Sequence, residues 1–176
     1  MLTDARSIAI VGNAASLLDA NHGLEIDDHE VIIRMNRGLP TNPEKQGRRT
    51  SILAFSVFPQ IADIYDQFGA DKLIWMSPKL RDEAPGDLEL EFYSLERWET
   101  LHSKLGARPS VGAMVLDYVS TFGSQSVNIY GFDFKRTTST YLEAPHIGPH
   151  NYQAEEAFCL SIVNERNWRI RRDYAD

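Results

Sequence analysis

The apolar residues of this chain gather in short unbroken runs that turn residues separate. Runs of this length that are apolar at nearly every position are typical of strands buried on both faces of a parallel sheet. Strands are therefore predicted over residues 7–12, 30–35, 50–55, 72–76, 90–93 and 126–130.

Several of the intervening segments carry apolar residues at helical spacing instead. They predict helices over residues 61–68, 111–122 and 151–166. Gly123 follows the second of these patterns as an expected C-terminal cap. The third helix is expected to bury one face: Ala154, Ala157, Phe158, Ser161 and Ile162.

Strands that alternate with helices predict an α/β fold, a mostly parallel sheet with helices on both faces. A length of 176 residues suits one domain with a sizeable core, so a single domain over residues 1–176 is expected. Ligands of such sheets bind at the carboxyl ends of the strands. The polar and glycine residues expected there are Gly12, Asn13, Asn36, Ser56 and Gly131.

The composition limits which partners the protein is expected to bind and where in the cell it is expected to lie. A net charge of −7 disfavours wholesale binding to nucleic acid or to an anionic bilayer. Cys159 is the only cysteine, which excludes an internal disulfide, and it is expected in the core. The first residues lack the basic start of a signal peptide, and no apolar run approaches the roughly 20 residues of a membrane span. We therefore expect a cytoplasmic protein, with peripheral contact to the inner membrane as an option.

The end of the first predicted strand is the first candidate for ligand binding. The segment Gly12-Asn13-Ala14-Ala15-Ser16 stands where a nicotinamide enzyme would carry its glycine-rich fingerprint, which is absent. Gly12 would let a ligand approach the backbone, and the Asn13 amide can donate a hydrogen bond without bringing charge. The alternative is an ordinary turn in which Asn13 or Ser16 caps a short helix.

Asn36 ends the second predicted strand and should lie beside Asn13. Strand alternation puts Arg34 and Asn36 on one face. A polar pair that faces a crevice suits phosphate binding; the alternative is a surface pair at a sheet edge.

The segment Arg108-Pro109-Ser110-Val111-Gly112 opens the most strongly patterned helix. Ser110 is a good N-cap, and a helix N-terminus also presents free N–H groups to an anion. Gly112 costs helix stability, which close approach by a ligand would explain. Ser110 can cap the helix while the free N–H groups of the same helix N-terminus bind an anion.

His150 precedes the last predicted helix, whose first turn carries Glu155. The positive end of that helix would keep His150 neutral, as a general base requires, and Glu155 could fix the tautomer of its ring. His146 lies in the same loop. The alternatives are a helix cap, a surface histidine or a metal ligand, but these two histidines lack the helical register of a zinc motif.

The order of these motifs resembles that of the sialyltransferases of glycosyltransferase family 29. The resemblance covers roughly residues 8–155. It rests on the following segments: Val11–Leu17 with Ile26–Asn36 as the large motif, Gly47-Arg48-Arg49-Thr50 as its continuation, Pro109–Gly112 with Ile129-Tyr130-Gly131-Phe132 as the small motif, and His150 to Glu155 as the final motif.

The chain departs from the family at three points. Thr140-Tyr141-Leu142-Glu143 stands where the family has a motif of His-Tyr-Tyr and an acid, so the histidine is missing unless His146 replaces it. Val111 replaces a threonine. We expect neither the disulfide nor the membrane anchor of the animal members, as in a bacterial type of relative.

The resemblance implies a GT-A-like (Rossmann-like) domain that transfers sialic acid from CMP-sialic acid to a glycan with inversion, without metal or other cofactor. Asn13 and Asn36 would hold the CMP, Ser110 and the N–H groups of Val111 and Gly112 the rest of the donor, and His150 would be the base. The remaining donor-site candidates are Gly12, Ser16, Gly131 and Tyr141. Candidates for mobile lids are the long loops 36–49, 77–89 and 132–149, and the last two are expected to contact the acceptor.

Three other interpretations of the sequence remain open, one of which is a purely structural α/β domain that binds no nucleotide. The same site would suit another CMP-activated ulosonic acid, such as CMP-Kdo, as the donor. The missing histidine would also suit a non-catalytic protein that binds CMP or a nucleotide-sugar. The acceptor, the linkage formed and the oligomeric state are not encoded in any motif of the chain.

Overall fold

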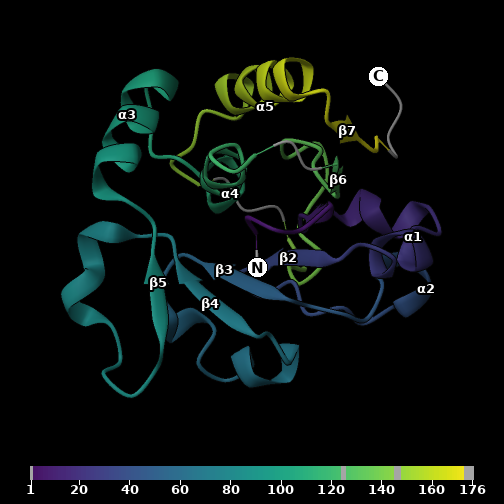
Figure 1. Ribbon diagram of the computed structural model, residues 1–176, viewed down its shortest axis with the longest axis horizontal. Helices are drawn as coiled ribbons and strands as arrows, with labels where there is room; N and C mark the ends of the chain where they lie inside the picture. Colours follow the sequence, from purple (N-terminus) through teal and green to yellow (C-terminus); the bar gives the residue numbers. More distant parts are fainter. Residues whose placement is uncertain (1, 124–125, 145–147, 173–176) are drawn as a thin grey trace.

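The computed structural model describes residues 2–123, 126–144 and 148–172. Seven parallel strands form one sheet in the order β5-β4-β3-β2-β1-β6-β7 (Figure 1). The strands are β1 (Ser7–Val11), β2 (Val31–Met35), β3 (Ile52–Phe55), β4 (Lys72–Trp75), β5 (Leu90–Phe92), β6 (Ser126–Tyr130) and β7 (Arg169–Ile170). All six predicted strands are confirmed. The short β7 was not predicted, because two residues leave no pattern.

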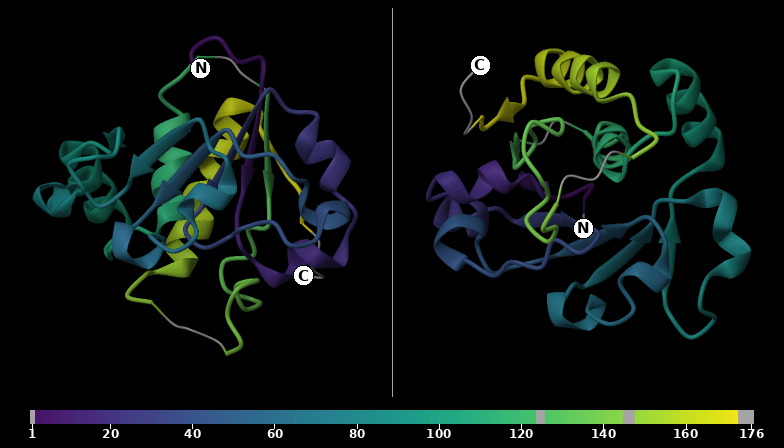
Figure 2. Two further views of the ribbon diagram at one scale, coloured as in Figure 1. Left: turned by 90° about the horizontal axis from the view of Figure 1, so that it is seen from below. Right: turned by 180° about the vertical axis from the view of Figure 1, so that it is seen from behind.

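The helices are of two kinds. Three longer α-helices, α3 (Leu95–Leu105), α4 (Val111–Val119) and α5 (Tyr152–Arg166), gather on one side of the sheet (Figures 1 and 2). The remaining ones are short: α1 (Gly23–Asp27), α2 (Pro43–Gln46) and the 3-10 helices η1 (Ala15–Asp19), η2 (Phe58–Gln60), η3 (Tyr65–Phe68) and η4 (Pro78–Glu83).

Strand alternation assigns each apolar side chain to one of the two faces. Ile8 and Ile10 of β1 belong to the large cluster that α3, α4 and α5 cover. Ala9 and Val11 face the other way, onto residues of η1 and α1. The predicted α/β fold with helices on both faces is therefore confirmed, with a thick cover on one face and a thin one on the other.

Two predicted helices differ in detail. Residues 61–68 form turns and the 3-10 helix η3 instead of one α-helix, and Ile61 and Phe68 pack with Phe55 and Trp75. The helical spacing of the apolar residues in this segment therefore reflects their burial against the sheet and not an α-helix. The helix α4 ends at Ser120, whose N–H bonds the carbonyls of Leu116 and Tyr118, so Gly123 is not its cap.

The helix α5 confirms the prediction over 151–166, with Asn151 as its N-cap. Its buried face is rotated from the expected one. Ala157 is exposed, because the sheet and α4 pack against a neighbouring row of side chains: Glu155, Phe158, Cys159, Ile162 and Val163. Cys159 is fully buried as predicted, and burial raises its pKa to about 12.

The chain after α5 returns to the sheet. Arg171 Nη2 lies 2.5 Å from Glu25 Oε1 on α1, so an ion pair joins segments 146 residues apart in sequence. No helix among the described residues combines the length and apolar character that a membrane span requires.

Candidate functional site

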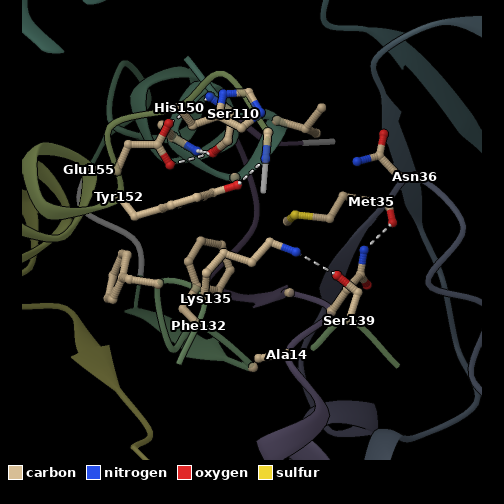
Figure 3. Close-up of a pocket in the computed structure, with 18 of the residues that line it drawn as sticks. Ala14, Met35, Asn36, Ser110, Phe132, Lys135, Ser139, His150, Tyr152 and Glu155 are labelled. Carbon is tan, nitrogen blue, oxygen red and sulfur yellow. Dashed lines mark hydrogen bonds between the residues drawn. The ribbon is translucent and has the colours of Figure 1, made fainter. Parts of the chain in front are cut away.

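A cavity of about 360 Å³ opens at the carboxyl ends of the strands. It lies where the strand order reverses, because β2 follows β1 on one side of β1 and β6 lies on the other side. Such a reversal leaves a crevice in which open α/β sheets bind ligands. The loops after β1, β2, β3 and β6, the start of α4 and the segment before α5 all contribute residues (Figure 3).

Three predicted glycines meet around the ring of Phe132. A Cβ on Gly12 would stand 2.4 Å from the Gly131 carbonyl oxygen and 2.7 Å from that ring, and a Cβ on Gly112 would stand 3.0 Å from it. Gly131 has a φ of +65°, and its own Cβ would meet the Gly12 oxygen at 2.8 Å. All three line the cavity, and packing within the protein already requires them to be glycine.

Asn13 also lines the cavity, and part of its amide is engaged. Asn13 Nδ2 donates to the Met35 carbonyl at 2.8 Å. A Cβ on Gly38 would stand 1.9 Å from Asn13 Oδ1, so the chain after β2 is fitted to this amide. The second N–H of the amide is not used by that bond, which leaves Asn13 able to donate to a ligand.

Asn36 is more available than Asn13. Its φ of +49° places it in the left-handed region, where asparagine is tolerated. Oδ1 accepts the backbone N–H of Ser56 at 3.0 Å, which fixes the amide so that Nδ2 points into the cavity (Figure 3). The prediction that the two asparagines lie on adjacent strand ends is confirmed.

Arg34 does not face the crevice with Asn36, contrary to the prediction. It is 1% exposed, and its guanidinium donates to the carbonyls of Gln46 at 2.7 Å and Arg49 at 3.0 Å. Burial lowers its pKa to about 10. The left-handed turn at Asn36 breaks the alternation on which the prediction rested, and Arg34 instead holds the loop before β3.

Ser110 and Glu155 form a closed unit at the start of α4. Glu155 accepts the Ser110 backbone N–H and its hydroxyl, both at 2.7 Å, while Ser110 Oγ caps Ala113 N–H at 3.1 Å. Burial raises the pKa of the Glu155 carboxyl, against the hydrogen bonds from Ser110. The donor groups of Ser110 are therefore committed within the protein, and those left for a ligand are the N–H groups of Val111 and Gly112, which have no acceptor within the helix.

His150 is held by a backbone carbonyl and not by Glu155. His150 Nδ1 lies 2.7 Å from the Arg108 carbonyl oxygen, which can only accept, so Nδ1 carries a proton. In the neutral ring Nε2 is then the free base, in the cavity lining. A Cβ on Gly148 would stand 2.9 Å from Nε2, so glycine keeps this atom open. His146, the other predicted histidine, lies outside the described residues.

Of two further residues predicted for the donor site, Tyr141 lines the cavity and Ser16 does not. Tyr141 lines the cavity and is 38% exposed. Ser16 is buried and does not line it, because its hydroxyl donates to Asp133 Oδ2 at 3.2 Å. Ser16 therefore supports the loop after β6 instead of reaching a ligand.

The start of the predicted lid 132–149 is fixed. Thr140 N–H donates to the Asn13 carbonyl at 2.8 Å, Ala15 N–H donates to Thr138 at 2.8 Å, and Ala14 bridges Ser139. The other expected acceptor loop, 77–89, carries η4 and contributes no described residue to the cavity.

Sequence reasoning missed Lys135, which places a cation in the cavity lining. Its Nζ donates to Ser139 Oγ at 3.0 Å (Figure 3). The available signal was its position soon after Gly131, at the carboxyl end of a central strand. Phe132 and Tyr152 also line the cavity and were not predicted for the site.

The fold and cavity together define a class, the open α/β proteins whose ligand crevice lies at a topological switch point. The monofunctional α-2,3-sialyltransferase Cst-I from Campylobacter jejuni has a TM-score of 0.69 to this chain, at 12% identity over 95% of this chain and 75% of its own. CstII from the same organism, solved with the substrate analogue CMP-3FNeuAc, has a TM-score of 0.64, at 10% identity over 94% and 79%. The chain has the fold of these sialyltransferases.

Sequence comparison reaches the same family. The sequence model of glycosyltransferase family 29 (sialyltransferase) matches residues 3–79. The mouse CMP-N-acetylneuraminate-beta-galactosamide-alpha-2,3-sialyltransferase 2 is 26% identical over an alignment that covers 72% of this chain and 43% of the mouse protein. The predicted resemblance is confirmed, and the large motif lies within the matched residues. The chain spans less than half the length of this curated relative.

Proposed function

We propose that this protein transfers sialic acid from CMP-sialic acid to a glycan hydroxyl, with inversion, without a metal ion and with His150 as general base. The observation that carries the proposal is the bond from His150 Nδ1 to the Arg108 carbonyl, which leaves Nε2 free in a cavity of nucleotide-binding type. The match to the sialyltransferase family and the CMP-analogue complex of CstII support this choice of donor.

The donor would occupy the strand ends. Asn13 and Asn36 offer amide N–H groups to the ribose and phosphate of CMP, and the start of α4 offers the N–H groups of Val111 and Gly112 to an anionic group such as the sugar carboxylate. The ring of Phe132 gives the cavity an apolar wall.

In the reaction, the acceptor hydroxyl attacks the anomeric carbon of the sialic acid. His150 Nε2 takes the hydroxyl proton as the new C–O bond forms, and the bond between that carbon and the phosphate oxygen breaks on the opposite side. CMP leaves with the bonding electron pair. The configuration at the anomeric carbon is therefore inverted, and general base catalysis of this kind contributes about 10²–10⁴ in rate.

The side chains at the cavity favour a mechanism without metal. In the parts of the chain that the structure describes, no three His, Cys, Asp or Glu side chains gather into a group that suits a metal ion. The carboxylates that line the cavity are engaged elsewhere: Glu155 by Ser110, and Asp133 by Ser16 and Thr137. The leaving group is a monophosphate, which helix N–H groups and amides can stabilise.

The first test is calorimetric titration with CMP in EDTA, on the wild type and on Asn36→Asp. Aspartate keeps the acceptor for Ser56 N–H and tolerates the left-handed φ, but it replaces the inward N–H donor by a negative oxygen. We expect CMP to bind without metal and N36D to bind it at least about tenfold more weakly.

Asn42→Asp is the matched control, because Asn42 is exposed on the loop before α2 and does not line the cavity. It should bind CMP as the wild type does. Failure of the wild type to bind millimolar CMP would overturn the proposal. Binding that metal restores would overturn its metal-independent part.

Donor and acceptor assays separate the remaining alternatives. Slow release of CMP from CMP-sialic acid identifies an enzyme, and a protein that only binds would release none. Release from CMP-Kdo alone would assign a different ulosonic acid. The name of the mouse relative makes β-galactosamide glycans the first acceptors to test. Transfer without change of anomeric configuration would contradict the inverting mechanism.

A further inference from the structure

We propose that Lys135 is a catalytic residue that binds the donor phosphate and stabilises the negative charge of the leaving CMP. This assignment rests on the proposed function of the cavity. The Lys135 ammonium has no ion-pair partner: among the described residues, no carboxylate lies within 4.0 Å of it, although the chain has a net charge of −7. A cation left without a carboxylate in the lining of a polar cavity is placed for an anionic ligand.

The backbone around Lys135 is built to present it. Phe134 and Lys135 have φ values of +54° and +68°, a left-handed conformation that is unfavourable for non-glycine residues. Asp133 holds this turn: its carboxylate accepts the backbone N–H groups of Lys135 at 3.1 Å and of Thr137 at 2.9 Å. The Asp133 carboxylate thus accepts backbone N–H groups of the turn and forms no ion pair within 4.0 Å of the Lys135 ammonium.

The ammonium is held over the strand ends by a neutral partner. Lys135 Nζ donates to the hydroxyl of Ser139, which is buried and bridges Ala14 next to Asn13. That single bond leaves two N–H donors of the ammonium for a ligand. Ser139 thus fixes the position of the charge without cancelling it.

The position of Lys135 relative to His150 indicates which donor group it contacts. Figure 3 shows the Lys135 amine directed at Ser139, on the side of the cavity away from His150. In an inverting displacement the nucleophile and the leaving group lie on opposite faces of the reacting carbon. Because His150 serves the nucleophile, a cation across the cavity faces the leaving phosphate. A cation there counts most as the C–O bond breaks and charge builds on that phosphate.

The test compares CMP with cytidine in calorimetric titrations of the wild type, Lys135→Gln and Lys135→Arg. Lys135 is exposed to solvent on one side, and glutamine keeps an N–H donor for Ser139, so K135Q should fold. We expect K135Q to weaken CMP binding by about 10- to 100-fold while cytidine binding stays within about twofold. K135R, which keeps the charge, should recover part of the loss.

Lys45→Gln is the control, because Lys45 lies on α2 outside the cavity lining and its loss should change neither affinity. CMP binding that K135Q leaves unchanged would overturn the assignment. So would a loss seen with CMP-sialic acid but not with CMP, which would place Lys135 at the sugar carboxylate. A wild type that does not bind CMP would overturn the proposed function and this assignment with it.

Discussion

The polar side chains around the cavity differ in how much of their hydrogen-bonding capacity the protein itself uses. Ser110 commits its backbone N–H and its hydroxyl to Glu155, and Ser16 commits its hydroxyl to Asp133. Asn36, Lys135 and His150 each keep a group free after their internal bond is made. The groups that remain free are a better guide to ligand contacts than the presence of a polar residue in a motif.

His150→Gln separates the base from the binding site. Glutamine keeps a donor for the Arg108 carbonyl but has no basic nitrogen, so we expect transfer to fall by about 10²–10⁴ while CMP affinity stays within about twofold. Initial rates and calorimetry measure the two effects. His102→Gln, on the outer part of α3 where it stacks on Trp98, should change neither. A variant H150Q with the wild-type rate would remove His150 from the mechanism.

At the scale of elements, the cavity depends on two strands that end in contact. The carboxyl ends of β1 and β6 meet through Gly12 and Gly131, and the ring of Phe132 separates them from the start of α4 at Gly112. The motifs of the sequence are thus packing contacts as well as ligand sites. Each of these glycines both packs against the protein and lines the cavity. A glycine in the motif therefore predicts where the site lies, but does not show whether the ligand or the protein requires it.

Alanine at three glycines separates backbone strain from packing. Gly69 and Gly131 both have positive φ, but only a Cβ on Gly131 meets another atom, whereas Gly123 has open space and no positive φ. We expect G123A to be nearly neutral, G69A to cost about 1 kcal/mol and G131A about 3 kcal/mol. Urea unfolding measures all three. Equal losses in G69A and G131A would show that the contact with Gly12 relaxes without cost.

At the scale of the whole molecule, ion pairs and hydrogen bonds join segments that are far apart in the sequence. The pair of Arg171 with Glu25 ties the last strand to α1, and the bonds from Ser110 to Glu155 tie α4 to α5. The buried Glu155 is the least favourable of these charges, since burial raises its pKa above the ordinary 4.5. A native carboxyl with a raised pKa binds its proton more tightly than the unfolded chain does.

The pH dependence of stability tests this charge. The contribution of Glu155 is fully present below about pH 4.5 and is lost as the pH rises through its raised native pKa. Glu155→Gln has no such loss, so the free energy of unfolding of E155Q relative to the wild type should rise between about pH 4 and about pH 7. Chemical denaturation at a series of pH values measures this difference, in which the other carboxylates cancel.

Glu30 supplies a control of opposite sign. Hydrogen bonds from the Arg6 backbone and side chain lower the pKa of Glu30, so its contribution is present above about pH 4.5 and is lost in acid. The free energy of unfolding of E30Q relative to the wild type should therefore fall as the pH rises to about 4.5 and stay constant above it, where that of E155Q continues to rise. If the free energy of unfolding of E155Q relative to the wild type did not change with pH, Glu155 would have the same pKa in the native protein as in the unfolded chain.

The sequence by itself determined the parts of this protein that local patterns encode. Unbroken apolar runs gave the six strands, because strands buried on both faces must be apolar throughout. Ser110 marked a helix start, because an N-cap bonds its own helix. The order of strand ends brought Gly12, Asn13 and Asn36 together, since parallel strands end at one edge of the sheet.

The tertiary structure alone decided which polar groups face the ligand. Arg34 turned inward to carbonyls, Ser16 turned to Asp133, and His150 took as its partner a backbone carbonyl 42 residues away. Lys135 entered the cavity through a left-handed turn that no periodicity predicts. Each outcome depends on which donor or acceptor lies within about 3 Å after the chain has packed, and residue type carries no information about that distance.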